Sequence, residues 1–188
     1  MLGLGVAEML LFYADVGVGY ACQHMAVGFP EDGGPGLFEP WYNPFRADGA
    51  GGIIDMPTYQ VTDLFARSVR ARTVPLAIPG NPEGTGLVGD EPFDYPMVHA
   101  VAFAGEEDGA LIGLNRQVEG PLPVRLRLPE GWTLRAATQW APAALDLDAK
   151  IQRTEAAPLP FDCTGTLCDL LLAPYSVFSL VAGPASGG

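Results

Sequence analysis

The stretch Leu170-Leu-Leu-Ala-Pro-Tyr-Ser-Val-Phe-Ser-Leu-Val181 decides how the second half of this chain folds. Pro174 fixes its own φ and has no N–H group, so the residues around it predict a turn that starts a strand. Side chains along that strand alternate between two faces. One face carries Tyr175, Val177, Ser179 and Val181, and the other carries Ser176, Phe178 and Leu180. The pattern predicts a turn followed by a closing strand.

From Thr73 onward the pattern is that of an all-β domain. Apolar and polar residues alternate at Val124–Leu128, as expected for an antiparallel strand with one solvated face. Gly105–Gly109 has the composition of a hairpin loop. The strands predicted in this half are Thr73–Ile78, Met97–Phe103, Ala110–Asn115, Val124–Leu128, Thr133–Trp140, Leu167–Leu172 and Ser176–Val181. Short strands at this spacing favour a sandwich or a barrel.

The first half follows a different pattern. Residues 4–14 contain few turn signals and predict a buried helix that ends near Asp15. The Gly-rich residues that follow suit a buried strand at Val18–His24 better than a helix. Gly28–Gly52 is a long Gly- and Pro-containing loop, and its aromatic residues argue against disorder. A second such loop is expected at Pro79–Pro96.

A second helix is predicted to open at Pro57, with Asp55 near its N-cap. Its apolar stripe consists of Val61, Leu64, Phe65 and Val69. Arg67, Arg70 and Arg72 are expected around its last turn, where cations suit the helix dipole. Helix, strand and helix form an α/β unit, and a parallel strand needs neighbours. The chain supplies none in the same layer, so the unit is expected to be completed by other polypeptide.

Composition excludes several classes of partner. The chain has 188 residues, 48% of them hydrophobic, which suffices for a substantial core. Its net charge of −12 argues against nucleic acid and against anionic membrane surfaces. No segment approaches the ~20 apolar residues that span a bilayer. Met1–Tyr13 lacks a basic region and a cleavage site, so we expect no signal peptide and a cytoplasmic location.

The three cysteines are Cys22, Cys163 and Cys168. Cys163 and Cys168 could join a hairpin in an oxidising compartment, but without a secretion signal two reduced, buried thiols are favoured. Cys22 and His24 lie on one side of an extended segment, and two ligands do not make a metal site. We therefore expect neither a metal nor another cofactor.

The order of these parts resembles the C-terminal portion of family 51 α-L-arabinofuranosidases, glycosidases in which a (β/α)8 TIM barrel is flanked by a jelly-roll-like sandwich. Met56-Pro-Thr-Tyr-Gln-Val-Thr-Asp-Leu-Phe65 is similar to the family's entry into its final barrel helix. Asp108–Arg116 resembles a sandwich strand that ends in an Asn-Arg pair, and Ala173-Pro-Tyr-Ser-Val177 resembles the family's closing strand. Other glycosidases with a barrel and a sandwich share this plan.

The resemblance implies a division of the chain at residue 72. Residues 1–72 would be the end of the barrel: the helix after strand seven, strand eight at Val18–His24, the loop at the barrel mouth and the last helix. Residues 73–188 would be the antiparallel sandwich. The fold class is thus an α/β barrel remnant plus an all-β sandwich.

The resemblance also implies that the catalytic residues lie elsewhere. A retaining glycosidase needs two carboxylates about 5–5.5 Å apart, and in this family they stand on barrel strands four and seven, which would precede Met1. The acids of the first half are Glu8, Asp15, Glu31, Asp32, Glu39, Asp48, Asp55 and Asp63. No pair of them is held at fixed spacing, so no catalytic residue is assigned.

Four residues are candidates for contact with substrate. Gln23 and His24 end the predicted strand eight, where barrel enzymes place their sites, although a packed His24 is the commoner outcome. Trp41 and Tyr42 suit a sugar-stacking wall, or equally a contact between the loop and the sandwich. Three further residues, expected to fill the layer between the sheets, are His99, Trp132 and Trp140.

The sequence leaves three functions open. The chain can be part of an arabinofuranosidase-like hydrolase that acts on an oligosaccharide, with the missing strands supplied by a second chain. It can be a non-catalytic sandwich that binds carbohydrate, or a structural component of an assembly, including a homo-oligomer. Only the first requires the helix and strand of the first half to complete a barrel.

Overall fold

The computed structural model describes residues 2–18, 27–28, 45–47, 50, 52–142 and 156–185. Within them lie two helices, α1 (Leu2–Asp15) and α2 (Pro57–Ser68). The largest sheet has six antiparallel strands in the order β11-β10-β14-β8-β7-β4. Their bounds are β4 Arg72–Val74, β7 Val98–Ala104, β8 Gly109–Asn115, β10 Trp132–Trp140, β11 Ala157–Pro158 and β14 Ser176–Pro184.

A second sheet packs on one face of the first. It has three antiparallel strands in the order β12-β13-β9, with bounds β9 Leu122–Arg127, β12 Phe161–Thr164 and β13 Leu167–Leu172. Apolar side chains from both sheets form one buried cluster between them. Its members are Val98, Leu122, Leu128, Leu134, Ala137, Leu159, Cys168, Leu170, Leu172, Phe178, Leu180 and Ala182. This is the predicted antiparallel sandwich.

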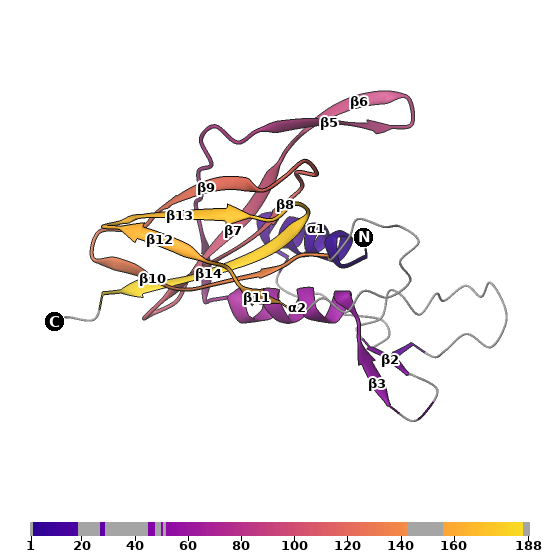
Figure 1. Cartoon of the computed structure of the whole chain (residues 1–188), viewed down its shortest axis with the longest axis horizontal. Coiled ribbons are helices and arrows are strands. Elements are labelled where there is room, and N and C mark those ends of the chain that lie inside the picture. Colours follow the sequence, from indigo (N-terminus) through magenta and orange to yellow (C-terminus); the bar gives the residue numbers. More distant parts are fainter. Residues whose placement is uncertain are drawn as a thin grey trace.

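The two helices cover the opposite face of the six-stranded sheet (Figure 1). A second buried cluster joins them to it, made of Leu4, Ala7, Leu11, Val61, Leu64, Val101, Phe103, Ile112, Leu114, Trp140 and Val177. The six-stranded sheet is therefore the middle of three layers. The helices pack on the sandwich itself, so this surface of the α/β portion is enclosed by its own chain.

Side chains of the closing strand β14 alternate between the two faces of the sheet, as the sequence predicts. Phe178 and Leu180 enter the cluster between the sheets, whereas Val177 enters the cluster under the helices. Tyr175, in the turn before it, has a φ of 46°, a conformation rare for residues other than glycine. Two hydrogen bonds hold the turn at the Ala173 carbonyl, from Asn115 Nδ2 at 2.7 Å and Ser176 Oγ at 2.8 Å.

The stretch expected to be a loop at Pro79–Pro96 instead contains a hairpin that projects from the body (Figure 1). Its strands are β5 (Glu83–Val88) and β6 (Glu91–Pro96). Gly84 and Gly86 conceal the strand pattern in the sequence. They sit opposite Tyr95 and Phe93, and a Cβ at either glycine would lie within 3.0 Å of the facing ring, so only glycine lets these rings fold across.

Residues near the start of α2 differ from expectation. Asp55 does not cap the helix, because it belongs to β3 (Ile53–Asp55), which pairs with β2 (Phe45–Ala47) beside β1 (Val27–Gly28). Met56 occupies the N-cap without a side-chain hydrogen bond, and Pro57 opens the helix as predicted. Of the three arginines, only Arg67 lies in the last turn.

The interpretation of Cys163 and Cys168 as reduced thiols is wrong. The two residues face each other across the β12–β13 hairpin and form a disulfide, with Cα atoms 4.1 Å apart. The register brings both Cβ atoms to the same face, which spacing along the sequence alone does not determine. Cys168 is fully buried between the sheets, whereas Cys163 is exposed.

Candidate functional site

The four predicted substrate contacts, Gln23, His24, Trp41 and Tyr42, lie outside the described residues, as do residues 19–24 of the predicted strand eight. They remain predictions. Within the described part of the chain no helix is long and apolar enough to cross a membrane. The same part contains no group of three or more His, Cys, Asp or Glu side chains able to hold a metal ion.

The most perturbed ionisable groups meet where α1 crosses β7 and the end of β8. Arg116, the residue after β8, donates two hydrogen bonds to the carboxylate of Glu8 on α1, one from Nε and one from Nη2. His99 of β7 lies beside them, with Nε2 2.5 Å from Asp15 Oδ2 and Nδ1 3.8 Å from Glu8 Oε2. The Arg116 guanidinium also lies 5.8 Å from the centre of the Tyr95 ring.

The charges of this cluster suit an anchor better than a catalyst. Burial raises the pKa of Glu8, but the hydrogen bonds from Arg116 and the nearby His99 imidazole outweigh it and lower that pKa to about 2. A general acid needs the opposite shift, toward the working pH. The nearby Glu8 carboxylate raises the pKa of His99 against the effect of burial, and Asp15 adds to the rise. Glu8 therefore stays ionised and fixes α1 to the sandwich.

Three further polar contacts join the second helix to the same sheet. Trp140 Nε1 donates to Gln60 Oε1 at 2.8 Å. The hydroxyls of Ser68 and Ser179 lie 2.7 Å apart in a buried position. Arg70, just past α2, forms a two-pronged pair with Asp108, both distances being 2.8 Å. Each contact links a residue of the first 72 to one of the sandwich.

These contacts correct the placement of two residues. His99 and Trp140 were expected between the sheets, yet both face the helices; Trp132 does pack against the cluster between the sheets. For His99 the alternation with Val98 contains the signal, because neighbouring residues face opposite ways. The sequence did not show that helices cover the opposite face.

The outer surface of α1 is apolar. Met9 and Phe12 on the helix are 40% and 57% exposed, and Val16, the first residue after it, is 57% exposed. Val18, just after the helix, is 44% exposed. We call these four residues the α1 stripe. A helix that is apolar on both sides is typical of a buried one, so the α1 stripe is a surface suited to contact with other polypeptide.

Comparison with known proteins places the fold. No sequence-family profile and no curated protein matches the chain. Among solved structures, a family 51 α-L-arabinofuranosidase from Bifidobacterium longum superposes with a TM-score of 0.76 at 16% identity, over 95% of this chain and 34% of that one. The chain has the fold of the C-terminal part of family 51 arabinofuranosidases.

Two other structures extend the comparison of this arabinofuranosidase-like fold. The α-L-arabinofuranosidase from Thermotoga maritima gives a TM-score of 0.68 at 15% identity, over 97% of this chain and 38% of that one. The catalytic domain of a family 30 xylanase from Talaromyces cellulolyticus gives 0.58 at 13% identity, over 96% and 34%. The chain thus spans little more than a third of the enzymes whose fold it shares, which fits a C-terminal portion.

The fold explains the motifs that carry the resemblance. Asn115 holds the turn before β14, and Arg116 holds α1. The Pro-Tyr-Ser segment forms that same turn. All three lie at the junction of the helices and the sandwich, so these motifs mark how the two parts are joined.

Proposed function

We propose that this chain is the non-catalytic C-terminal portion of an arabinofuranosidase-like glycosidase. Polypeptide that completes the (β/α)8 barrel would supply both catalytic carboxylates and release arabinofuranosyl residues from plant-type polysaccharides. The α1 stripe is the observation that carries this proposal, because it gathers four exposed apolar side chains on α1 and just after its end. The similarity to about a third of each family 51 enzyme supports it.

The test uses the chain isolated from its source and the same chain produced alone. We expect the native material to contain additional polypeptide and to hydrolyse p-nitrophenyl α-L-arabinofuranoside, whereas the chain produced alone is inactive. Phe12→Glu, introduced in the source, should remove both the added mass and the activity. The matched control is Val118→Glu, since Val118 is 50% exposed but lies outside α1. Hydrolysis by the chain produced alone would contradict the proposal.

A second candidate function is carbohydrate binding by the sandwich itself. The rings of Phe93 and Tyr95 lie across Gly86 and Gly84 on one face of the projecting hairpin, with centres 5.7 Å apart, and Phe93 is 45% exposed. An exposed ring beside a half-buried one suits stacking against sugar faces. Calorimetry with arabinan and arabinoxylan oligosaccharides tests it: Phe93→Ala should abolish the heat of binding, and Val118→Ala should not.

We propose that the chain resides in an oxidising compartment. The disulfide favours an oxidising compartment, because glutathione and thioredoxin keep most cytosolic thiols reduced. It therefore opposes the cytoplasmic location expected from the sequence. Alkylation of thiols in freshly opened cells, followed by mass measurement of the Cys163–Cys168 peptide, distinguishes the two locations.

A further inference from the structure

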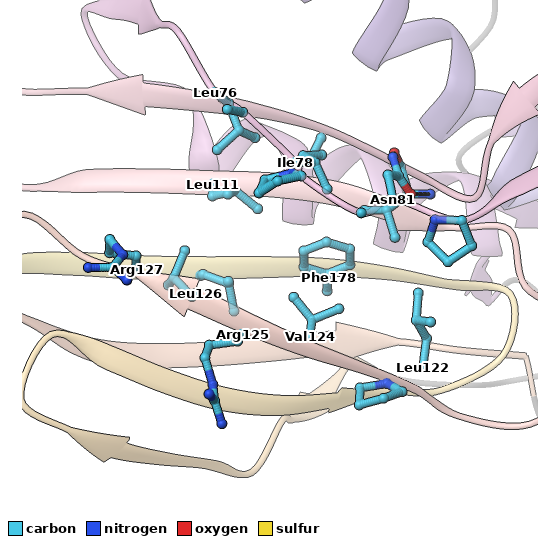
Figure 2. A pocket seen from close by; sticks show the side chains of 18 of the residues that line it. Leu76, Ile78, Asn81, Leu111, Leu122, Val124, Arg125, Leu126, Arg127 and Phe178 are labelled. Carbon is cyan, nitrogen blue, oxygen red and sulfur yellow. Dashed lines mark hydrogen bonds between the residues drawn. The ribbon is translucent and has the colours of Figure 1, made fainter.

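The β5–β6 hairpin forms a small sheet of its own. Its base is fixed, because the Asn81 side chain exchanges two hydrogen bonds with the main chain of Val98, at 2.7 and 3.0 Å (Figure 2). Beyond this point β5 and β6 pair only with each other among the described residues. Leu87 and Val88 near the tip are each 69% exposed. Two strands alone are marginally stable in water, and stable sheets normally contain at least a third.

The main-chain groups of the hairpin point alternately inward, to the other strand, and outward. Met97 N–H donates to the Pro82 carbonyl at 2.7 Å, so residues 82 and 97 form a hydrogen-bonded pair at the base. Such pairs recur at every second position of an antiparallel ladder. The other inward pairs in this register are Gly84–Tyr95, Gly86–Phe93 and Val88–Glu91. The residues between them therefore present their N–H and carbonyl groups at the outer edges of the hairpin.

The outer edge of β6 is closed to a further strand. Its outward positions are Pro92, Asp94 and Pro96. Proline has no N–H group, so only Asp94 retains a donor on this edge. The Pro96 carbonyl already accepts a hydrogen bond from Arg116 Nη1 at 2.5 Å. Prolines on an edge strand are a common protection against unwanted pairing.

The outer edge of β5 has no such protection. Its outward residues are Glu83, Thr85 and Leu87, and each has both an N–H and a carbonyl to offer. Among the described residues, none of these main-chain groups has a hydrogen-bond partner. Exposed strand edges of this kind are templates for another strand. A sugar ring would leave this row of groups largely unpaired, whereas an extended strand satisfies it.

The outward residues of β5 are complementary to themselves. Two β5 strands related by a two-fold axis at Thr85 run antiparallel and place Thr85 opposite Thr85, and Leu87 opposite Glu83 of the second copy. Threonine pairs are favourable across strands, whereas like charges directly opposite are unfavourable. This register contains the first and avoids the second. An axis at Leu87 or Glu83 would instead place Thr85 opposite residue 89 in the turn or residue 81 at the base, outside the strand.

We propose that two copies of this chain pair through β5, in a four-stranded sheet of order β6-β5-β5-β6. A two-fold axis makes the contact closed, as in most dimers. In this register Gly84 of one copy lies opposite Gly86 of the other. The rings of Phe93 and Tyr95, which fold across these glycines within each hairpin, then meet over the centre of the sheet. The missing glycine side chains thus serve the pairing as well as the single hairpin.

Analytical ultracentrifugation of the full chain measures the association. The chain carries Phe12→Glu throughout, so that contact at the α1 stripe does not contribute. We expect a reversible dimer with a Kd of about 0.1 mM, because the interface is small. Added sodium chloride should strengthen the dimer, since it screens the repulsion between two chains of net charge −12.

Two proline substitutions locate the contact. Thr85→Pro removes the central donor of the outer β5 edge, and Asp94→Pro removes the remaining donor of the outer β6 edge. Both break the hydrogen bond from Thr85 Oγ1 to Asp94 Oδ1 (2.8 Å), and neither removes a hydrogen bond between β5 and β6. Thr85→Pro should weaken the dimer at least tenfold, whereas Asp94→Pro should leave it nearly unchanged.

Charge substitutions test the register. Leu87→Glu places a carboxylate opposite Glu83 at both ends of the β5 pair and should weaken the dimer at least tenfold. Adding Glu83→Lys converts both contacts into pairs of opposite charge and should restore the dimer. Adding Glu91→Lys instead makes the same change in net charge on β6 and should not restore it.

Amide hydrogen exchange observes the pairing directly. As the protein concentration rises, exchange should slow at the amides of Thr85 and Leu87 and stay constant at Asp94. A chain that remains monomeric, equal weakening by the two prolines, or failure of Glu83→Lys to restore the Leu87→Glu variant would each overturn the inference. The proposed function is tested separately, because the polypeptide expected at the α1 stripe differs in sequence from this chain.

Discussion

The two faces of the six-stranded sheet are covered in different ways. Toward the helices, polar contacts cross the boundary in several places, from Glu8–Arg116 at one end to Arg70–Asp108 at the other. Toward the three-stranded sheet, the boundary is an apolar cluster without such contacts among its members. Hydrogen bonds need defined distances and angles, whereas apolar packing tolerates repacking. These polar contacts therefore fix the position of the helices on the six-stranded sheet.

The two faces also differ in how completely their inward side chains are buried. Under the helices, the inward residues Val101 and Ile112 are buried to 5% and 1% exposure. On the other face, Ala100 and Leu111 on the same two strands remain half-buried. Substitutions at the buried positions under the helices should therefore cost the isolated chain more stability than substitutions at Ala100 and Leu111.

The largest effect is expected from Trp140→Ala. This side chain is 2% exposed and joins the helices to the sheet both by packing and by its hydrogen bond to Gln60. Removing a buried tryptophan leaves a cavity, which costs about 3–5 kcal/mol. Urea denaturation followed by circular dichroism measures it, with Leu171→Ala as the exposed control. A loss below about 1 kcal/mol would show that the helices pack loosely.

Arg116→Ala should follow, with a loss of about 2–3 kcal/mol, because it leaves the half-buried Glu8 carboxylate without its two hydrogen bonds. Arg116→Lys keeps the charge but not the paired geometry and should lose less. A double-mutant cycle with Glu8→Gln measures the coupling in the same denaturation experiment. Additive effects of the two substitutions would show that the pair does not anchor α1.

The disulfide in the three-stranded sheet offers a comparable test. Cys163→Ala removes the cross-link while the buried Cys168 keeps its place in the cluster. Because the enclosed loop is short, the loss should be about 2 kcal/mol. Dithiothreitol should destabilise the wild-type chain by the same amount and leave the variant unchanged. A further loss in the variant under reduction would contradict this explanation.

The pH dependence tests the charge cluster in solution. The pKa of Glu8 falls from its ordinary value of 4.5 to about 2, so its stabilisation is present above 4.5 and is lost as pH falls through about 2. The pKa of His99 is raised from 6.5, so its stabilisation is present below 6.5 and is lost as pH rises through the raised value. Because Glu8 is 39% exposed, we expect its part to be about 1 kcal/mol.

Two variants separate the loss of stability at acid pH from the loss at higher pH. Glu8→Gln should flatten the loss of stability below pH 4.5, and His99→Gln should flatten the loss above 6.5. Denaturation midpoints measured in buffers across that range check both. If Glu8→Gln leaves the acid limb unchanged, another carboxylate is responsible for it.

The fold was predictable where periodicity is local. Strands β8 and β14 and helix α1 appear in the sequence at nearly their observed positions, because alternation and helical spacing are visible within a few residues. The β5–β6 hairpin was not, since Gly84 and Gly86 become favourable only once Tyr95 and Phe93 lie opposite. The match between two strands is a property of register, which a scan along one segment does not contain.

Trp140 shows a second limit. Simple alternation places it on the same face as Leu134, between the sheets. The pairing of β10 with β14 shifts register between Leu134 and Ala136. As a result, Leu134 and Ala137 point into the layer between the sheets, while Trp140 points toward the helices. A bulge of one residue inverts every later side chain. The predicted contacts at Gln23, His24, Trp41 and Tyr42 still await a test.

The smallest effect is expected from Arg125→Ala. Its pair with Asp169 lies on the solvent face of β9 and β13, with side chains 65% and 60% exposed. Water and salt screen such a pair, so the denaturation midpoint should not move beyond error. A measurable shift of the midpoint would show that this exposed pair stabilises the two strands despite screening.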